Sequence, residues 1–231
     1  MARQIITIVL LVVLVIFMTY VVAKNRKEKR DRTNVVRTMA RVGVFAAIST
    51  ILYVVPLFNF TIPGILPTFL KFHFDEIPAL IAGFAFGPFS AFGIILIKTF
   101  IKLPLGGANT MYVGEISDFI YSLALVLPAA IIYKRHRKFK FAALGLAIGF
   151  ICQIVISTLM NVYVMIPLYM KLFSMNEETI MFMMPPFVKD AKWSYALLSV
   201  IPFNVVKNIL VIAVTLVVYK PLHRLIEKIK F

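Results

Sequence analysis

The chain has 231 residues, of which 61% are hydrophobic and 15% are charged, and its mean hydropathy is +0.93. This composition excludes a soluble globular domain, which could not bury so much apolar surface, and it indicates an integral membrane protein. The formal net charge of +15 would also suit a nucleic-acid-binding protein. However, 17 of the 25 Lys and Arg residues lie in three clusters, at 24–41, 134–140 and 220–230. Because the positive-inside rule produces such clusters in cytoplasmic loops, the charge argues against nucleic acid as a partner.

The first apolar run, residues 5–23, is about as long as a helix that spans a bilayer. One arginine precedes it and a densely basic stretch follows it. These flanks favour an uncleaved anchor with its N-terminus outside over a cleaved signal peptide. We therefore divide the chain into an N-terminal transmembrane anchor with a basic linker, residues 1–34, and a six-helix membrane domain, residues 35–231.

The second apolar run, residues 35–55, carries a strip of small residues, Ala40, Gly43 and Ala47, on one helix face. Such a strip lets another helix approach closely. The neighbour could belong to this protein or to a partner protein, and the strip alone does not decide between them. After this span, residues 56–73 combine several prolines with large apolar side chains, which predicts a loop that folds over the bundle as a cap.

Acidic residues open the next spans. Asp75 and Glu76 precede a run at 79–86, where a helix start would favour acids. After a break at 87–88, a second run extends to residue 103 and carries two lysines. Glu115 and Asp118 then begin a span that ends near the second basic cluster. These two acids could act as helix-dipole partners, as ion-pair partners of the two lysines, Lys98 and Lys102, or as part of a binding site.

Residues 141–172 are too many for one straight span, so we expect the outer end to tilt or to leave the bilayer. This segment contains Asn161, at the level where Asn204 should fall in a neighbouring antiparallel helix. Residues 173–192 follow as a second outer loop. With spans starting outside, all three basic clusters fall on the cytoplasmic side, and we expect a bacterial plasma-membrane protein with its C-terminus cytoplasmic.

The last apolar run, residues 193–219, contains the most informative polar group. Lys207 lies in the middle of this run, where a charge is costly unless it faces a protein interior or a wet cavity. Asn204 is three residues earlier and shares its helix face. Pro202 removes a backbone donor and predicts an irregular turn just before Asn204. We therefore predict a polar ligand socket here, with helix–helix hydrogen bonding or an internal salt bridge as the alternative role for these side chains.

The chain lacks several common catalytic motifs. It has no phosphate-binding loop of the form GxxxxGK[ST], no HExxH, no GxSxG and no cysteine pair. It therefore cannot hydrolyse ATP by the phosphate-loop route, and the sequence shows no metal set or nucleophile set that a membrane enzyme would need. We expect a binder or a transporter subunit rather than an enzyme, without a cofactor or metal.

Several segments resemble one family. From residue 38 to residue 230 the chain resembles the substrate-binding S components of energy-coupling factor (ECF) vitamin transporters, and within them the riboflavin type. The resemblance rests on residues 69–80 (FLKFHFDEIPAL), 86–88 (FGP), 114–119 (GEISDF), 159–169 (LMNVYVMIPLY) and 202–207 (PFNVVK). The last two segments are the most specific to the riboflavin type. The extra N-terminal span at 5–23 departs from the family pattern.

The resemblance implies a six-helix S component that binds a vitamin near the outer face, under the loop that follows the first core helix. It implies a membrane scaffold subunit and two cytoplasmic ATPases as partners, with ATP used by those partners. Gly43 and Ala47 match the small-residue surface that the family presents to the scaffold. The implied substrate-binding residues are Leu70, Lys71, Glu115, Asn161, Asn204 and Lys207.

Riboflavin suits these side chains. Its ring system is flat and largely apolar, and its edge carries carbonyl and N–H groups that need hydrogen-bond partners when buried. The alternatives are an S component for another small vitamin or precursor, and a membrane assembly protein whose polar residues only hold helices together.

Overall fold

The structure, a computed structural model, describes residues 32–62, 70–106, 113–182 and 184–228. The expected N-terminal anchor at residues 5–23 lies outside this part of the chain. The helices are α2 (Arg32–Val54), α3 (Glu76–Phe86), α4 (Pro88–Gly106), α5 (Val113–His136), α6 (Phe139–Met160), α7 (Ile166–Leu172), α8 (Glu177–Phe182), α9 (Trp193–Tyr195) and α10 (Ile201–Lys228). Two π-helical turns, η1 (Asn161–Met165) and η2 (Ala196–Val200), and two strands, β1 (Asn59–Phe60) and β2 (Phe72–His73), complete the elements.

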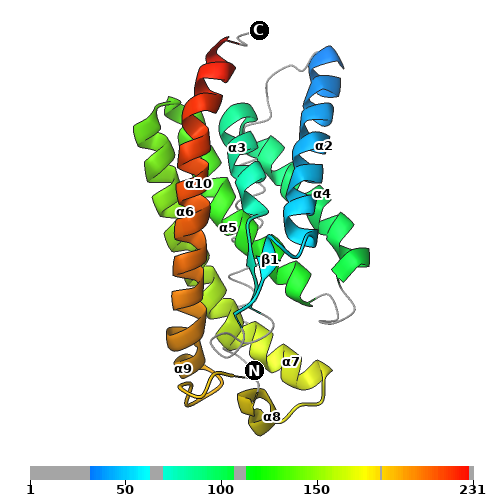
Figure 1. The fold of residues 1–231 in the computed structure, drawn as a ribbon, viewed down its shortest axis with the longest axis vertical. Helices are drawn as coiled ribbons and strands as arrows, with labels where there is room; N and C mark the ends of the chain where they lie inside the picture. The colour runs from blue at the N-terminus through cyan, green and yellow to red at the C-terminus, as the bar shows by residue number, and fades with distance from the viewer. Residues whose placement is uncertain (1–31, 63–69, 107–112, 183, 229–231) are drawn as a thin grey trace.

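The helices form the expected all-α membrane bundle. The turn η1 joins α6 to α7, and η2 joins α9 to α10, so two long rods pack with α2, α3, α4 and α5 (Figure 1). In the described ranges, four segments are long and apolar enough to cross a membrane: Val36–Val54, Val113–His136, Phe139–Leu172 and Trp193–Tyr219. The helix α3 has 11 residues, fewer than the about 20 that a spanning helix needs. The segment that contains α3 therefore also includes extended chain, at β2, just before the helix.

The outer surface of the bundle is apolar, as a bilayer requires. On α6, large exposed aliphatic side chains recur at a spacing of three to four residues and so form one stripe along the helix: they are Leu144, Ile148, Ile151 and Val155. On α10, the exposed side chains are again Val, Ile and Leu. In water such stripes would be an aggregation hazard, whereas in hydrocarbon they are the expected contact surface.

The basic ends of the helices gather at one end of the bundle. Figure 1 shows the start of α2 and the end of α10 at the same end, opposite to α7, α8 and α9. The hydroxyl groups of Tyr133 on α5 and Tyr219 on α10 are hydrogen-bonded at 2.8 Å, and Phe84 packs against both rings. This contact places the second basic cluster, which follows Tyr133, beside the third, which follows Tyr219.

Each π-turn lies directly before an Ile-Pro pair. In η1, the N–H of Ile166 donates to the carbonyl of Asn161, and in η2 the N–H of Ile201 donates to the carbonyl of Ala196. Pro167 and Pro202 follow and cannot donate to the preceding turn, so a wider, five-residue turn forms in front of each. The irregularity predicted before Asn204 is confirmed. The turn η1 bends its long rod, and α7 therefore leaves the axis of α6 (Figure 1).

Glycines hold α5 and α6 in close contact. A Cβ atom added to Gly149 would lie 2.2 Å from the backbone oxygen of Leu125, and one added to Gly145 would lie 2.8 Å from that of Ala129. No side chain larger than hydrogen fits at Gly149 unless the helices separate. By contrast, a Cβ atom on Gly43 would meet nothing within 4 Å.

We expect Gly149→Ala to lower the free energy of unfolding by about 1–3 kcal/mol, because the added methyl group collides with the α5 backbone. Thermal unfolding of the detergent-solubilised chain measures this effect. Gly43→Ala is the matched control and should leave the melting temperature unchanged or slightly raised, since alanine favours a helix. Equal melting temperatures for the two variants would contradict the close packing of α5 on α6.

Candidate ligand-binding site

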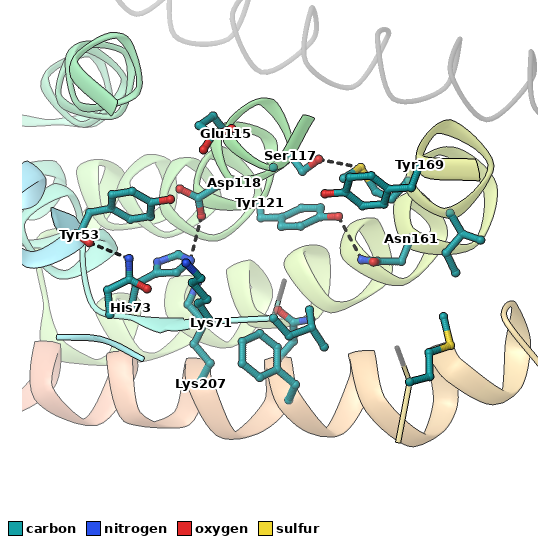
Figure 2. Close-up of a pocket in the computed structure, with 18 of the residues that line it drawn as sticks. Tyr53, Lys71, His73, Glu115, Ser117, Asp118, Tyr121, Asn161, Tyr169 and Lys207 are labelled. Atoms are coloured by element: carbon teal, nitrogen blue, oxygen red, sulfur yellow. Dashed lines mark hydrogen bonds and ion pairs between the residues drawn. The ribbon is translucent and has the colours of Figure 1, made fainter. Parts of the chain in front are cut away.

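A cavity of about 660 Å³ lies between α5, η1, α7 and α10, at the end of the bundle away from the basic clusters. Its volume is in the range of sites for small organic molecules. Much of its wall is aromatic or made of thioethers, which provide flat, adaptable apolar surface. Figure 2 shows several of the residues that line it. The aromatic and methionine side chains are Tyr53, Tyr121, Met165, Tyr169, Phe173, Met175, Met184 and Phe203.

The strand pair β1–β2 closes one side of this cavity. It is antiparallel, with Phe60 opposite Phe72. The rings of these two residues stack at 5.5 Å, and Phe72 also meets Phe203 of α10 edge-to-face at 4.8 Å. These contacts fix β2, so the residues just before it, buried Leu70 and exposed Lys71, reach the cavity. The rest of the predicted cap, residues 63–69, falls outside the described ranges.

All six predicted substrate-binding residues line this one cavity: Leu70, Lys71, Glu115, Asn161, Asn204 and Lys207. They come from segments that are far apart in sequence and that the fold brings together. Their part in binding a ligand stays a prediction, because the cavity shows only that they surround one space.

Asn161 presents an acceptor to the cavity. Its Nδ2 group donates to the carbonyl of Ser157 at 2.8 Å and to the hydroxyl of Tyr121 at 3.1 Å (Figure 2). Both amide hydrogens are then used, and the carbonyl oxygen Oδ1 is the group left for a ligand. A ligand N–H is therefore the natural partner of Asn161.

Asn204 presents a donor. Its Nδ2 group donates to the carbonyl of Val200 at 2.8 Å, and its Oδ1 atom accepts from Nε2 of Gln153, also at 2.8 Å. One Nδ2 hydrogen has no partner among the described residues. The two asparagines thus differ in what they can recognise, although both are buried in the wall of the same cavity.

Lys207 is both an ion-pair partner and a lining residue. Its Nζ atom lies 2.6 Å from Oε1 of Glu76 and 3.2 Å from Nε2 of His73. The internal salt bridge considered as an alternative is therefore present. An ammonium group has three hydrogens, so after these two contacts one remains to donate to a ligand.

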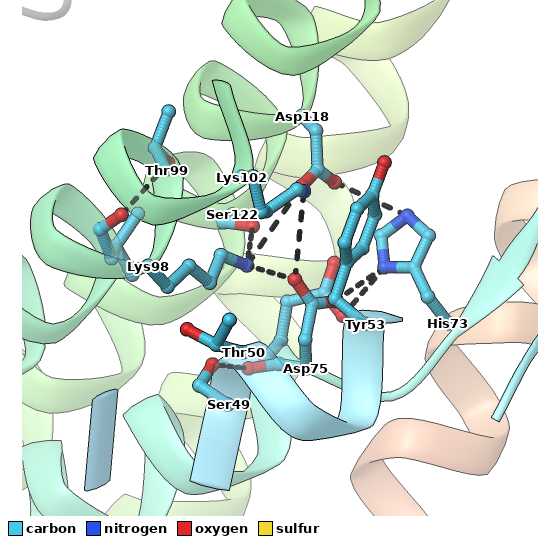
Figure 3. A network of polar contacts seen from close by, with 12 residues as sticks. Ser49, Thr50, Tyr53, His73, Asp75, Lys98, Thr99, Lys102, Asp118 and Ser122 are labelled. Carbon is cyan, nitrogen blue, oxygen red and sulfur yellow. Dashed lines mark hydrogen bonds and ion pairs between the residues drawn. The ribbon is translucent and has the colours of Figure 1, made fainter. Parts of the chain in front are cut away.

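A network of buried charges includes His73, Asp118 and Lys207 of the cavity wall and extends behind it (Figure 3). Nζ of Lys98 is 2.5 Å from Oδ2 of Asp75 and donates to Ser122 at 3.0 Å. Lys102 pairs directly with Asp118, so this acid forms the expected ion pair, and it also lines the cavity. His73 lies between the two acids: its Nδ1 donates to Asp75, and its Nε2, which accepts from Lys207, is 3.2 Å from Asp118.

Charges balance within this network. Three lysines, Lys98, Lys102 and Lys207, face three carboxylates, those of Asp75, Glu76 and Asp118. Burial opposes the charge on Asp75, and the ammonium groups of Lys98 and Lys102, 2.5 Å and 3.8 Å from its Oδ2 atom, compensate for it.

Sequence reasoning missed part of this site. The sequence alone gives His73 no role and predicts only a helix start at Asp75 and Glu76, where α3 does begin. The available signal was the FHFDE segment, in which three ionisable residues interrupt an apolar stretch. Intramembrane ionisable groups usually have partners.

Three of these groups also have the spacing of a metal site. One ligand atom each from His73, Asp75 and Asp118 lies within 4.8 Å of the others. However, Lys98 and Lys102 already contact the two carboxylates. A divalent cation would bring further positive charge beside two ammonium groups, so we assign this cluster to ion pairing.

Comparisons with known proteins agree with this fold. Residues 37–219 match the family described as "ECF transporter, substrate-specific component". The chain belongs to this family, whose members are transporter components and not enzymes.

Two relatives are riboflavin transporters by name. The chain is 27% identical to riboflavin transporter FmnP of Bacillus subtilis (strain 168), over 80% of this chain and 93% of the relative. It is 26% identical to riboflavin transporter RibU of Staphylococcus aureus (strain TCH60), over 82% of this chain and 93% of the relative. A solved structure, "Structure and mechanism of the S component of a bacterial ECF transporter", matches with a TM-score of 0.64 at 26% identity, covering 84% of this chain and 98% of that one.

Removal of one charge from the network should destabilise the fold. We expect Lys98→Met to cost about 3–5 kcal/mol, because Asp75 keeps a buried charge without its nearest ammonium. Thermal unfolding in detergent measures the loss. The double variant Lys98→Met/Asp75→Asn should recover part of it, whereas Lys134→Met, at an exposed position, should change little. A double variant no more stable than Lys98→Met alone would contradict a specific pairing.

Proposed function

We propose that the chain is the riboflavin-binding subunit of an ECF transporter and takes up the vitamin together with a membrane scaffold subunit and two ATPases. The observation that carries the proposal is the polar set on the cavity wall. Asn161 offers an acceptor, while Asn204 and Lys207 offer donors. The isoalloxazine edge carries two carbonyl groups flanking one N–H, and so needs two donors and one acceptor when buried.

The apolar part of the cavity supports the same ligand. Aromatic and methionine side chains make up much of the wall, and a flat ring system buries its faces well against such surface. Glu115 and Lys71 lie on the same cavity and add polar groups suited to the hydroxyls of a ribityl chain. The names of the relatives point in the same direction.

The partner proposal rests on the surface of α2. Gly43 and Ala47 are exposed, and no atom would obstruct a side chain at Gly43. A strip of small exposed residues on a membrane helix allows another helix to approach closely. In this proposal the scaffold docks there, ATP is hydrolysed by the two ATPases, and the chain itself needs no cofactor. The C-terminus is cytoplasmic and the N-terminus outside in a bacterial plasma membrane.

Riboflavin titration of the detergent-purified chain tests the ligand. We expect bound riboflavin to lose emission, and thiamine and folate to compete poorly. Wild-type chain that leaves flavin emission unchanged while it binds thiamine or folate would point to a different vitamin.

Asn161→Leu should weaken riboflavin binding by about 1–3 kcal/mol, because a ligand N–H would lose its acceptor inside a dry site. Glu76→Gln/Lys207→Met should weaken it similarly, and the paired change keeps the buried charges balanced. The same titration measures both. Asn176→Ala, an exposed asparagine outside the cavity wall, is the control and should bind as wild type does. Unchanged affinity in both cavity variants would exclude these residues as the site.

Substitution of the small strip tests docking. Gly43→Phe should prevent co-purification with the scaffold and ATPase subunits, since the bulky side chain blocks close approach. Riboflavin binding by the isolated chain should stay unchanged, because Gly43 does not line the cavity. Normal assembly of Gly43→Phe would move the docking surface elsewhere.

A further inference from the structure

Three amide side chains form a buried hydrogen-bonded row between α6 and α10. Nε2 of Gln153 donates to Oδ1 of Asn204 at 2.8 Å, and Oε1 of Gln153 accepts from Nδ2 of Asn208 at 2.6 Å. Their exposed fractions are 2%, 4% and 0% for Gln153, Asn204 and Asn208. Asn204 lines the cavity, whereas the other two stand behind it. The row therefore reaches the cavity only through Asn204.

The direction of this row is fixed at one end by a backbone carbonyl. The Val200 oxygen can only accept, so the Asn204 group that faces it must be the Nδ2 donor. The Oδ1 atom of Asn204 is then turned toward Gln153. A reversed Asn204 amide would set oxygen against oxygen at Val200 and N–H against N–H at Gln153. Each of these contacts would leave buried polar groups unpaired, at a cost of about 1–3 kcal/mol per group.

Gln153 thus helps to hold the Asn204 carboxamide, whose oxygen and nitrogen ends have nearly the same shape, in one of its two orientations. Without a donor at position 153, the Oδ1 atom of Asn204 would have no partner in the described structure, and rotation of the carboxamide would be less costly. With Gln153 in place, the remaining Nδ2 hydrogen of Asn204 is available for an acceptor atom. At Asn161, by contrast, both amide hydrogens are held by Ser157 and Tyr121.

We propose that Gln153, with Asn208 behind it, is a positioning residue that makes Asn204 select a ligand carbonyl over a ligand N–H. The inference rests on the proposed function, because the carbonyl that accepts from Asn204 Nδ2 is taken to belong to riboflavin. Gln153 acts through Asn204 and touches no ligand atom. The hydrogen-bonded row thus determines that the ligand atom facing Asn204 is an acceptor.

A thermodynamic cycle between the protein and the ligand tests the proposal. Riboflavin is compared with its 2-thio and 4-thio analogues, in which one ring-edge carbonyl becomes a thiocarbonyl, a weaker acceptor. Wild-type chain should prefer riboflavin over one of the two analogues, and Gln153→Met should reduce that preference about tenfold, which is the size of one hydrogen bond. A change in packing alone would lower the affinity for both ligands and keep their ratio.

Two further variants complete the test. Val155→Met, on the lipid-facing side of the same helix, should keep the wild-type preference. Asn208→Leu removes the partner behind Gln153 and should reduce the preference in the same direction by a smaller factor; it also serves if Gln153→Met fails to fold. If Gln153→Met keeps the wild-type ratio of affinities for riboflavin and the analogue, the inference is wrong. If only Asn208→Leu folds, the same result in that variant has the same meaning. In both cases the proposal of riboflavin binding is unaffected.

A measurement without ligand separates the inference from the proposed function. If wild-type chain does not bind riboflavin, the proposed function fails, and the row is judged by NMR of the chain labelled with ¹⁵N at asparagine. The Asn204 side-chain amide signals, assigned by their loss in Asn204→Ser, should shift in Gln153→Met and not in Val155→Met. Identical Asn204 signals in wild type and Gln153→Met would show that Gln153 does not hold the Asn204 side chain.

Discussion

The ion pairs that join the start of α3 to three other helices are the constraint on which the rest of the structure depends. Asp75 and Glu76 lie side by side, yet Asp75 reaches Lys98 on α4 and Glu76 reaches Lys207 on α10. His73, just before them, reaches Asp118 on α5. Because an uncompensated charge in hydrocarbon is costly, these contacts determine where α4, α5 and α10 stand around the short helix α3. The cavity is lined by three of these charged residues, His73, Asp118 and Lys207.

The second determinant is backbone rather than charge. Pro167 and Pro202 each impose a π-turn on a long rod, and the cavity asparagines lie at or just after these turns. A wider turn alters the face on which the following residues emerge. Asn161 begins one such turn, and Asn204 follows the other by a few residues. The two prolines therefore help to bring an acceptor and a donor into one cavity wall from two different rods.

Much of this architecture could be predicted from the sequence, and particular residues show why the rest could not. Hydrophobic length predicted the bundle, and Pro202 predicted the irregular turn before Asn204, since both effects act along the chain. Lys98 and Lys102 could be matched to an acid only as one of several options for Asp118. His73 could not be placed at all, because its partners lie at the start of α3, on α5 and on α10, and only the packing of the helices brings them together. Gln153 was likewise only an isolated amide in an apolar run.

The balance of charge inside the membrane restricts how this chain can change over evolutionary time. Three lysines pair with three carboxylates, so loss of any one of these residues leaves the charge of its partner uncompensated inside the bundle. A lineage that replaced one of them would have to pass through a poorly folding ancestor or change both members together. The two residues of each ion pair should therefore be replaced together, so that the residue at one position in a distant homologue indicates the residue at the other.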